Sequence, residues 1–213
     1  MKGQKQCSTD FLILRKTPYS ETSLVVAGLS PDLGQIHFMV RGARKVGGRN
    51  FPLIDLFRIL HVQYRQGKSE LHTWQSADLV RDFAGVARNL NGFQTAGWLA
   101  RFALANIPGG LECRRVFDAM KTGLAHLEGI ADEPSKSAKL RHATMVGVCL
   151  VYLSENGLIP DYENDACTKK QCLSLIAAAL GECALPSLTT QSWQSLFNWT
   201  LSLLRHAECV VPE

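Results

Sequence analysis

Hydrophobic and polar residues alternate along the first part of the chain with the period of β-strands. Ile36, Phe38 and Val40 are expected to face inward, while the residues between them and Arg41 face outward. A period of two predicts a half-buried strand. Four other stretches are rich in β-forming residues and are bounded by turn signals: 11–17, 22–29, 53–64 and 70–75. Five short strands so close together predict a small closed barrel, which leaves no open sheet edge.

The spacing of apolar residues becomes helical in the remainder of the chain. Segments around 98–105, 116–127 and 193–204 each carry apolar residues three or four positions apart, and they are separated by Pro- and Gly-containing breaks. This period predicts α-helices with one apolar face. We therefore predict an α+β chain, with a β-barrel domain over residues 1–78 and an α-helical domain over residues 79–213.

Composition, the lengths of the apolar runs and the cysteines indicate the class of protein and its expected location in the cell. The chain is 46% hydrophobic and 20% charged, as in ordinary globular proteins. The first apolar run, 11–14, is shorter than a signal-peptide core, and the run 143–153 is shorter than the roughly 20 residues of a membrane span. Seven scattered cysteines do not resemble a disulfide framework. We expect a cytoplasmic protein with no membrane association.

The excess positive charge lies in the barrel domain. Residues 1–80 carry eleven Lys and Arg against six acidic residues, whereas the rest carries twelve against thirteen. Four cations fall within nine consecutive positions that hold no acid: Arg41, Arg44, Lys45 and Arg49. Arginine engages phosphate oxygens in pairs, and the interleaved glycines allow close approach of a phosphate chain. This loop therefore predicts nucleic-acid binding, although such loops also occur on ordinary solvated surfaces.

Aromatic residues in the barrel domain are candidates for stacking on unpaired bases. Tyr19 lies in a predicted turn and Trp74 in a predicted strand. Basic loops and exposed aromatic side chains on small barrels are typical of single-strand binding. For Trp74, a place in the barrel core is the alternative interpretation.

The order of several short motifs resembles the RecO family of bacterial recombination mediators. The run 11–24 resembles the family's first strand, its Pro-Tyr turn with a following Glu, and the start of the second strand. The stretches 29–35 and 40–44 resemble its next turn and its Gly-Ala-Arg basic segment, and 53–57 stands where the family has a Leu-x-Pro-Phe-like element, here without proline. The stretch 140–161 is similar to the family's central long helix and the turn that follows it.

This resemblance implies an N-terminal OB-fold barrel and a C-terminal helical domain. It implies a protein that binds and anneals single-stranded DNA and helps to load recombinase onto strands coated by single-strand-binding protein, usually with a RecR-like partner. Combined with the charge pattern, it indicates seven DNA-binding residues: Arg15, Lys16, Tyr19, Arg41, Arg44, Lys45 and Arg49.

The cysteines depart from the family pattern. Many members carry four zinc-binding cysteines in two Cys-x-x-Cys pairs, but here four residues separate Cys167 from Cys172 and Cys183 follows alone. Structural zinc requires four closely spaced ligands. We expect no intact four-cysteine zinc module and no cofactor, and the alternative is a set completed through the fold by Cys209 or His206.

Two further interpretations concern activity. The sequence lacks a phosphate-binding Gly-Lys-Ser/Thr loop, a nucleophile elbow and a His-Glu-x-x-His pair, so we predict no enzymatic activity. The alternative function is a protein–protein adaptor with little direct DNA binding. In that case the aromatic closing segment, with Trp193, Phe197 and Trp199, presents a groove to a partner's peptide tail, although core packing also accounts for such a segment.

Overall fold

A computed structural model describes residues 6–44, 53–67, 70–129, 134–160 and 166–213. The chain divides into two compact units, and each is described by itself. The first unit comprises residues 1–84 and 103–114, and the second comprises residues 85–102 and 115–213.

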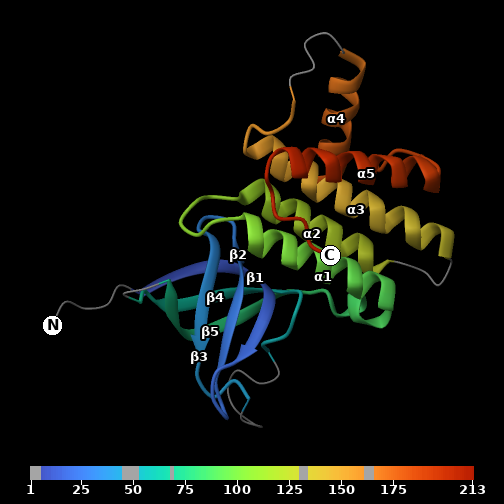
Figure 1. Cartoon of the computed structure of the whole chain (residues 1–213). Coiled ribbons are helices and arrows are strands. Elements are labelled where there is room, and N and C mark those ends of the chain that lie inside the picture. The colour runs from blue at the N-terminus through green and yellow to red at the C-terminus, as the bar shows by residue number, and fades with distance from the viewer. Residues whose placement is uncertain (1–5, 45–52, 68–69, 130–133, 161–165) are drawn as a thin grey trace. The chain divides into compact units, whose positions relative to one another are not determined.

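The first unit contains a closed five-stranded barrel, drawn in blue to teal in Figure 1. Its strands are β1 (Gln6–Pro18), β2 (Leu24–Ser30), β3 (Gly34–Val40), β4 (Arg58–Arg65) and β5 (Leu71–Asp82). They follow the order β1-β2-β3-β5-β4, with a parallel β3–β5 pair over His37–Met39 and Leu71–Thr73. Antiparallel pairing of β1 with β4 closes the circle. The predicted five-stranded OB-type barrel is confirmed.

Inward-facing side chains of all five strands fill the barrel. The alternation predicted for β3 is confirmed, because Ile36, Phe38 and Val40 are buried while their neighbours are partly exposed. Phe38 makes edge-to-face contacts with Phe11, at 4.9 Å between ring centroids, and with Trp74, at 5.6 Å. Such contacts add to the energy of apolar burial. Trp74 therefore belongs to the barrel core and does not present its ring for base stacking.

The fourth strand begins later than the pattern predicts. Residues 53–57 form turns and not the start of a strand, and Phe57 has a φ of 60°. Ile54 and Phe57 are nevertheless buried. The apolar residues of this segment therefore indicate packing in the core, and they do not belong to a strand. The amide of Phe57 donates to Ile13 O at 2.9 Å, and Arg58 Nη1 donates to Leu53 O at 2.9 Å. These bonds hold the segment against the barrel.

Helices make up most of the second unit. In the described parts of the chain, the helices are the 3-10 helix η1 (Ala84–Arg88), α1 (Leu90–Asn106), α2 (Arg114–Glu128), α3 (Pro134–Glu155), α4 (Ala166–Ala179) and α5 (Thr190–His206). In Figure 1, α3 lies between α2 and α5, and it also contacts α4. Residues 143–153 of α3 are buried without interruption, because neighbouring helices cover this helix on several sides. The predicted helical half is confirmed.

Small residues allow the helices to approach closely. A Cβ on Gly123 of α2 would lie 2.6 Å from the Cγ2 of Thr144, and one on Gly147 of α3 would lie 2.7 Å from the Cβ of Ala179. Both distances are shorter than a carbon–carbon contact allows. Glycine is therefore required where α3 crosses α2 and α4.

Candidate nucleic-acid interface

Two connections leave the barrel at the same end. The β1–β2 pairing ends with Pro18 opposite Leu24, and Leu24 is also opposite Val40, the last residue of β3. The turn 19–23 and the segment 41–44 therefore lie side by side. They define what we call the basic end of the barrel, made of Tyr19–Ser23 and Arg41–Arg44.

Hydrogen bonds join the two parts of the basic end. The amide of Arg44 donates to Thr22 O at 3.0 Å, and its guanidinium Nη1 donates to Ser20 O at 3.2 Å. Ala43 is buried and Gly42 has a φ of 68°, so the chain turns sharply while one side chain anchors it. The cations of this segment therefore have a defined position beside the β1–β2 turn.

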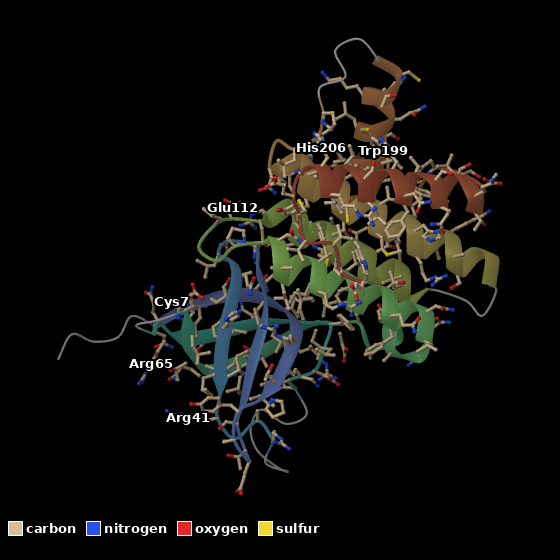
Figure 2. All side chains as sticks on the ribbon, viewed as in Figure 1. Cys7, Arg41, Arg65, Glu112, Trp199 and His206 are labelled. Atoms are coloured by element: carbon tan, nitrogen blue, oxygen red, sulfur yellow. The ribbon has the colours of Figure 1, made fainter. Side chains whose placement is uncertain are left out.

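The two arginines and the tyrosine of the basic end are exposed and suit a polyanionic partner, whereas Glu21, in the same turn, is an exposed acid. Arg41 projects from the barrel into solvent (Figure 2), and it makes no ion pair with any residue that the structure describes. Tyr19 is 69% exposed, which leaves its ring accessible to an unpaired base. The structure thus brings together Tyr19, Arg41 and Arg44. Lys45 and Arg49, which were also predicted, lie outside the described residues.

Lys16 is engaged by an acid close to the basic end. Its Nζ forms an ion pair with Asp55, in the turn that precedes β4. Burial alone would raise the pKa of Asp55. However, hydrogen bonds from Lys16 and the Leu56 amide, together with the charges of Lys16 and Arg58, hold that pKa below its ordinary value. Asp55 is therefore charged at neutral pH, and a phosphate would have to compete with it for Lys16.

Arg15 lies farther along the barrel wall than the other predicted residues. It is exposed, and it is opposite Ala27, which is in turn opposite His37. Directly opposed residues on neighbouring strands share one face of a sheet. Arg15 therefore shares a row with His37, and its predicted DNA contact would lie on the wall and not at the basic end itself.

Arg65 is a further exposed cation that the sequence analysis did not single out. It is opposite Thr73, which is opposite Met39, two residues before Arg41. Figure 2 shows its side chain projecting from the barrel, as does that of Arg41. Adjacent strands lie about 4.8 Å apart, so β4 is roughly 10 Å from β3 on this side. Arg65 is far from the basic segment in the sequence, and the β4–β5–β3 pairing relates the two.

The cysteines that were considered as zinc ligands lie in different environments. Cys167 and Cys172 lie on α4, where Cys167 is exposed and Cys172 is buried. Cys183 is exposed and its thiol donates to Ser174 O at 3.8 Å. Over the residues that the structure describes, no three His, Cys, Asp or Glu side chains are grouped so that they could hold a metal ion. The expectation of no zinc module stays a prediction.

The second unit carries a small apolar groove. It has a volume of about 310 Å³ and is lined by α3, the segment 185–188 and the start of α5. Trp193 and Leu140 form part of its wall, and Lys139 is the one cation among the described residues that line it. Among the helices that the structure describes, none is long and apolar enough to cross a membrane.

Comparison with known proteins identifies similar chains. Residues 1–83 match the family model described as "Recombination protein O N terminal". A protein named DNA repair protein RecO from Gloeobacter violaceus is 30% identical over 131 residues, which cover 61% of this chain and 49% of that protein.

Two further relatives carry the same name. The one from Alteromonas mediterranea is 29% identical over 157 residues, covering 72% of this chain and 61% of that protein. The one from Burkholderia pseudomallei is 32% identical over 98 residues, covering 45% and 35%. The chain thus spans about half the length of the curated relatives it matches.

Proposed function

We propose that the chain, whose residues 1–83 match the N-terminal model of recombination protein O, is a DNA-binding recombination mediator of the RecO family. It acts in DNA repair and homologous recombination by binding alone, without catalysis. It anneals complementary single strands and assists recombinase loading onto strands coated by single-strand-binding protein, with a RecR-like partner.

The observation that carries this proposal is the meeting of Tyr19, Arg41 and Arg44 at one end of the barrel. The exposed Tyr19 ring is next in sequence to Ser20, whose main-chain oxygen accepts from the Arg44 guanidinium, and Arg41 is exposed on the adjoining segment. Such a surface offers an unpaired strand both base and phosphate contacts. Among the described residues, the positive surface is extended by Arg15, Lys16 and Arg65. Lys45 and Arg49 are proposed as further phosphate contacts from their place in the basic sequence alone. Each phosphate neutralised releases counterions, so affinity should fall steeply as salt rises.

The proposal is tested by removing the charges of the basic segment together. A variant with glutamine at Arg41, Arg44, Lys45 and Arg49 should lose at least tenfold in affinity for a single-stranded oligonucleotide at low salt, and its salt dependence should flatten. A control variant replaces four exposed cations of the second unit: Arg88, Lys169, Lys170 and Arg205. Equal affinities of the wild type and the first variant would contradict DNA binding by this segment.

Annealing is tested separately. Complementary strands precoated with the cognate single-strand-binding protein are mixed with and without the full chain, and duplex formation is followed by fluorescence. The chain should accelerate annealing, and the variant of the basic segment should not. No acceleration by the wild type would contradict the mediator role, even if strand binding persisted.

A second candidate function is supported by the apolar groove of the second unit. A groove lined by Trp193 and Leu140 with Lys139 at its side suits an apolar peptide that carries acidic residues. In this alternative the chain is an adaptor for the acidic tail of single-strand-binding protein. Binding of that tail together with no binding of DNA at low salt would favour the adaptor. A mediator should bind both.

A further inference from the structure

A pocket of about 620 Å³ opens in the first unit near the beginning of β3, away from the basic end. Its lining comes from the start of β3, the end of β4, the residues just before and within β5, and the turn that follows α1. The volume is in the range of small-molecule sites. No function assigned above uses this pocket.

One wall of the pocket is built from fixed main chain. The amide of Gly110 donates to Leu33 O at 2.8 Å, and the amide of Gln35 donates to Pro108 O at 3.2 Å. A bridge between Gly34 and Gly109 joins the same two segments. A pocket whose wall is held by such bonds does not need to be ordered by its ligand, which lowers the cost of binding.

Aromatic rings form a second part of the lining. Tyr64 and His72 are stacked with ring centroids 5.3 Å apart and an angle of 27° between their planes. Tyr64 is buried to 5% exposure, whereas His72 is half-buried and lines the pocket. A planar ligand therefore finds a supported ring against which it can pack.

The two histidines of the pocket are neutral and have defined tautomers. The amide of Gly67 donates to Nδ1 of His72 at 3.1 Å, so His72 carries its proton on Nε2 as a donor. The Gln35 carboxamide donates to the oxygens of Leu104 and Ile107, at 2.9 and 3.0 Å, and its oxygen accepts from Nε2 of His37 at 2.9 Å. Nδ1 of His37 is then an acceptor.

Further evidence for neutral rings comes from their surroundings. Burial lowers the pKa of His37, and the nearby charge of Arg15 lowers it further, whereas Glu70 raises it. Burial also lowers the pKa of His72, with a smaller contribution from His37. Both imidazoles are therefore neutral at pH 7.5.

The charge of the lining selects the class of ligand. Glu70 contributes a carboxylate, and no Lys or Arg is present among the described residues that line the pocket. The negative charge of Glu70 disfavours a phosphate beside it. The lining offers an anionic acceptor, a neutral donor from His72 and a neutral acceptor from His37 to a planar group.

We propose that this pocket binds one unpaired base of a DNA strand, taking adenine or cytosine in preference to thymine. Both preferred bases carry an amino group, which donates to Glu70, next to an unprotonated ring nitrogen, which accepts from His72. Thymine would place a carbonyl oxygen against the carboxylate. Bases in single strands are commonly recognised through such edges while they stack on aromatic side chains.

Arg15 extends this site toward the backbone of the strand. It shares a row with His37 across β1, β2 and β3, and its charge influences that ring. With adjacent strands about 4.8 Å apart, the Cα atoms of Arg15 and His37 are separated by roughly 10 Å. The guanidinium can therefore hold a phosphate while the attached base enters the pocket. This inference rests on the proposed binding of single strands.

The test compares two strands and three proteins. Affinities of the full chain for 12-nucleotide oligo-dC and oligo-dT are measured by fluorescence anisotropy at pH 7.5 and low salt. The wild type should bind oligo-dC about tenfold more tightly than oligo-dT, since one good base-edge contact gives discrimination of this order. Glu70→Gln should bring the two affinities within about twofold. Asp78→Asn, an exposed β5 change with the same charge difference, should keep the preference.

A second measurement locates the base directly. An oligo-dT 12-mer with one central 5-iododeoxycytidine is photo-crosslinked to the wild type, and the modified peptide is identified by mass spectrometry. Crosslinks should fall on Tyr64 or His72. Strand binding with equal affinities, or crosslinks confined to the basic end, would overturn the base pocket and leave the proposed function intact. Failure of the wild type to bind either strand would overturn both.

Discussion

The guanidinium of Arg44 donates a hydrogen bond to the main-chain oxygen of Ser20 at 3.2 Å, which couples the segment after β3 to the turn between β1 and β2. The side chain therefore has two roles at the basic end: it supplies charge, and it supports the turn that carries Tyr19. Arg41 is exposed and has only the first of these roles. The two arginines should consequently differ when each is replaced.

Replacing Arg41 by Gln should reduce the slope of log affinity against log salt by about 0.7 for a single strand, the contribution of one phosphate contact. Arg44→Gln should reduce the slope equally and also increase amide hydrogen exchange over residues 19–23, since the Ser20 contact is lost. Salt titrations and exchange followed by mass spectrometry measure both effects. An unchanged slope in both variants would show that neither guanidinium meets a phosphate.

The ion pair between Lys16 and Asp55 predicts a variant that binds DNA more tightly. Asp55→Asn should leave the ammonium available, and affinity for a single strand at low salt should rise about two- to fivefold, as expected for one more phosphate contact at a partly exposed site. Asp78→Asn is the matched control, because it changes the net charge equally away from Lys16. An equal gain in both variants would indicate a general charge effect and no specific release of Lys16.

The barrel was predictable because its strands are rich in β-forming residues, are separated by strong turn signals and show a clear alternation in β3. The turn at 53–57 could not be predicted in this way, because Ile54 and Phe57 are apolar and buried but belong to an irregular segment. The far end of β5 was missed for the opposite reason. Leu79, Val80 and Arg81 are all exposed, so no alternation marks the strand there.

The candidate site shows the same division between local and non-local information. Arg41 and Arg44 are close in sequence and could be predicted from charge alone. The position of Arg65 relative to the basic segment depends on strand pairing. Lys16 forms its ion pair with a turn 39 residues away. No local sequence pattern indicates either relationship. The pocket is less accessible still to sequence reasoning, because several separate segments line it.

Close approach of β1 and β2 predicts a strong effect of substituting Gly28. A Cβ at this position would lie 1.9 Å from the main-chain oxygen of Leu12, so the strands must separate to accept it. Gly28→Ala should reduce the free energy of unfolding by about 3 kcal/mol, the upper range for overpacking. Urea denaturation followed by circular dichroism measures the loss.

Gly42→Ala is the control for Gly28→Ala, because it introduces backbone strain without a steric clash. A Cβ on Gly42 meets nothing within 4 Å among the described atoms, but its φ of 68° disfavours alanine, so the loss should be about 1 kcal/mol. Similar losses for the two variants would contradict the close strand contact at Gly28.

Partly buried histidines predict loss of stability on mild acidification. Burial lowers the pKa of His37, His72, His126 and His142 below the ordinary value of about 6.5, with Arg141 also acting on His142. The unfolded chain then binds more protons than the folded chain as the pH falls through 6.5. The stabilisation is therefore complete above that pH and is lost progressively toward the lowered pKa values.

A phenylalanine at His142 tests this pH dependence at one position. The His142 ring stacks on Phe197 with centroids 5.5 Å apart, so His142→Phe should keep the packing while removing the titrating group. Melting temperatures between pH 7.5 and 5 should fall less steeply for this variant than for the wild type. His206→Gln, at the exposed end of α5, should follow the wild-type curve. Identical curves for the wild type and His142→Phe would exclude His142 as a source of the acid sensitivity.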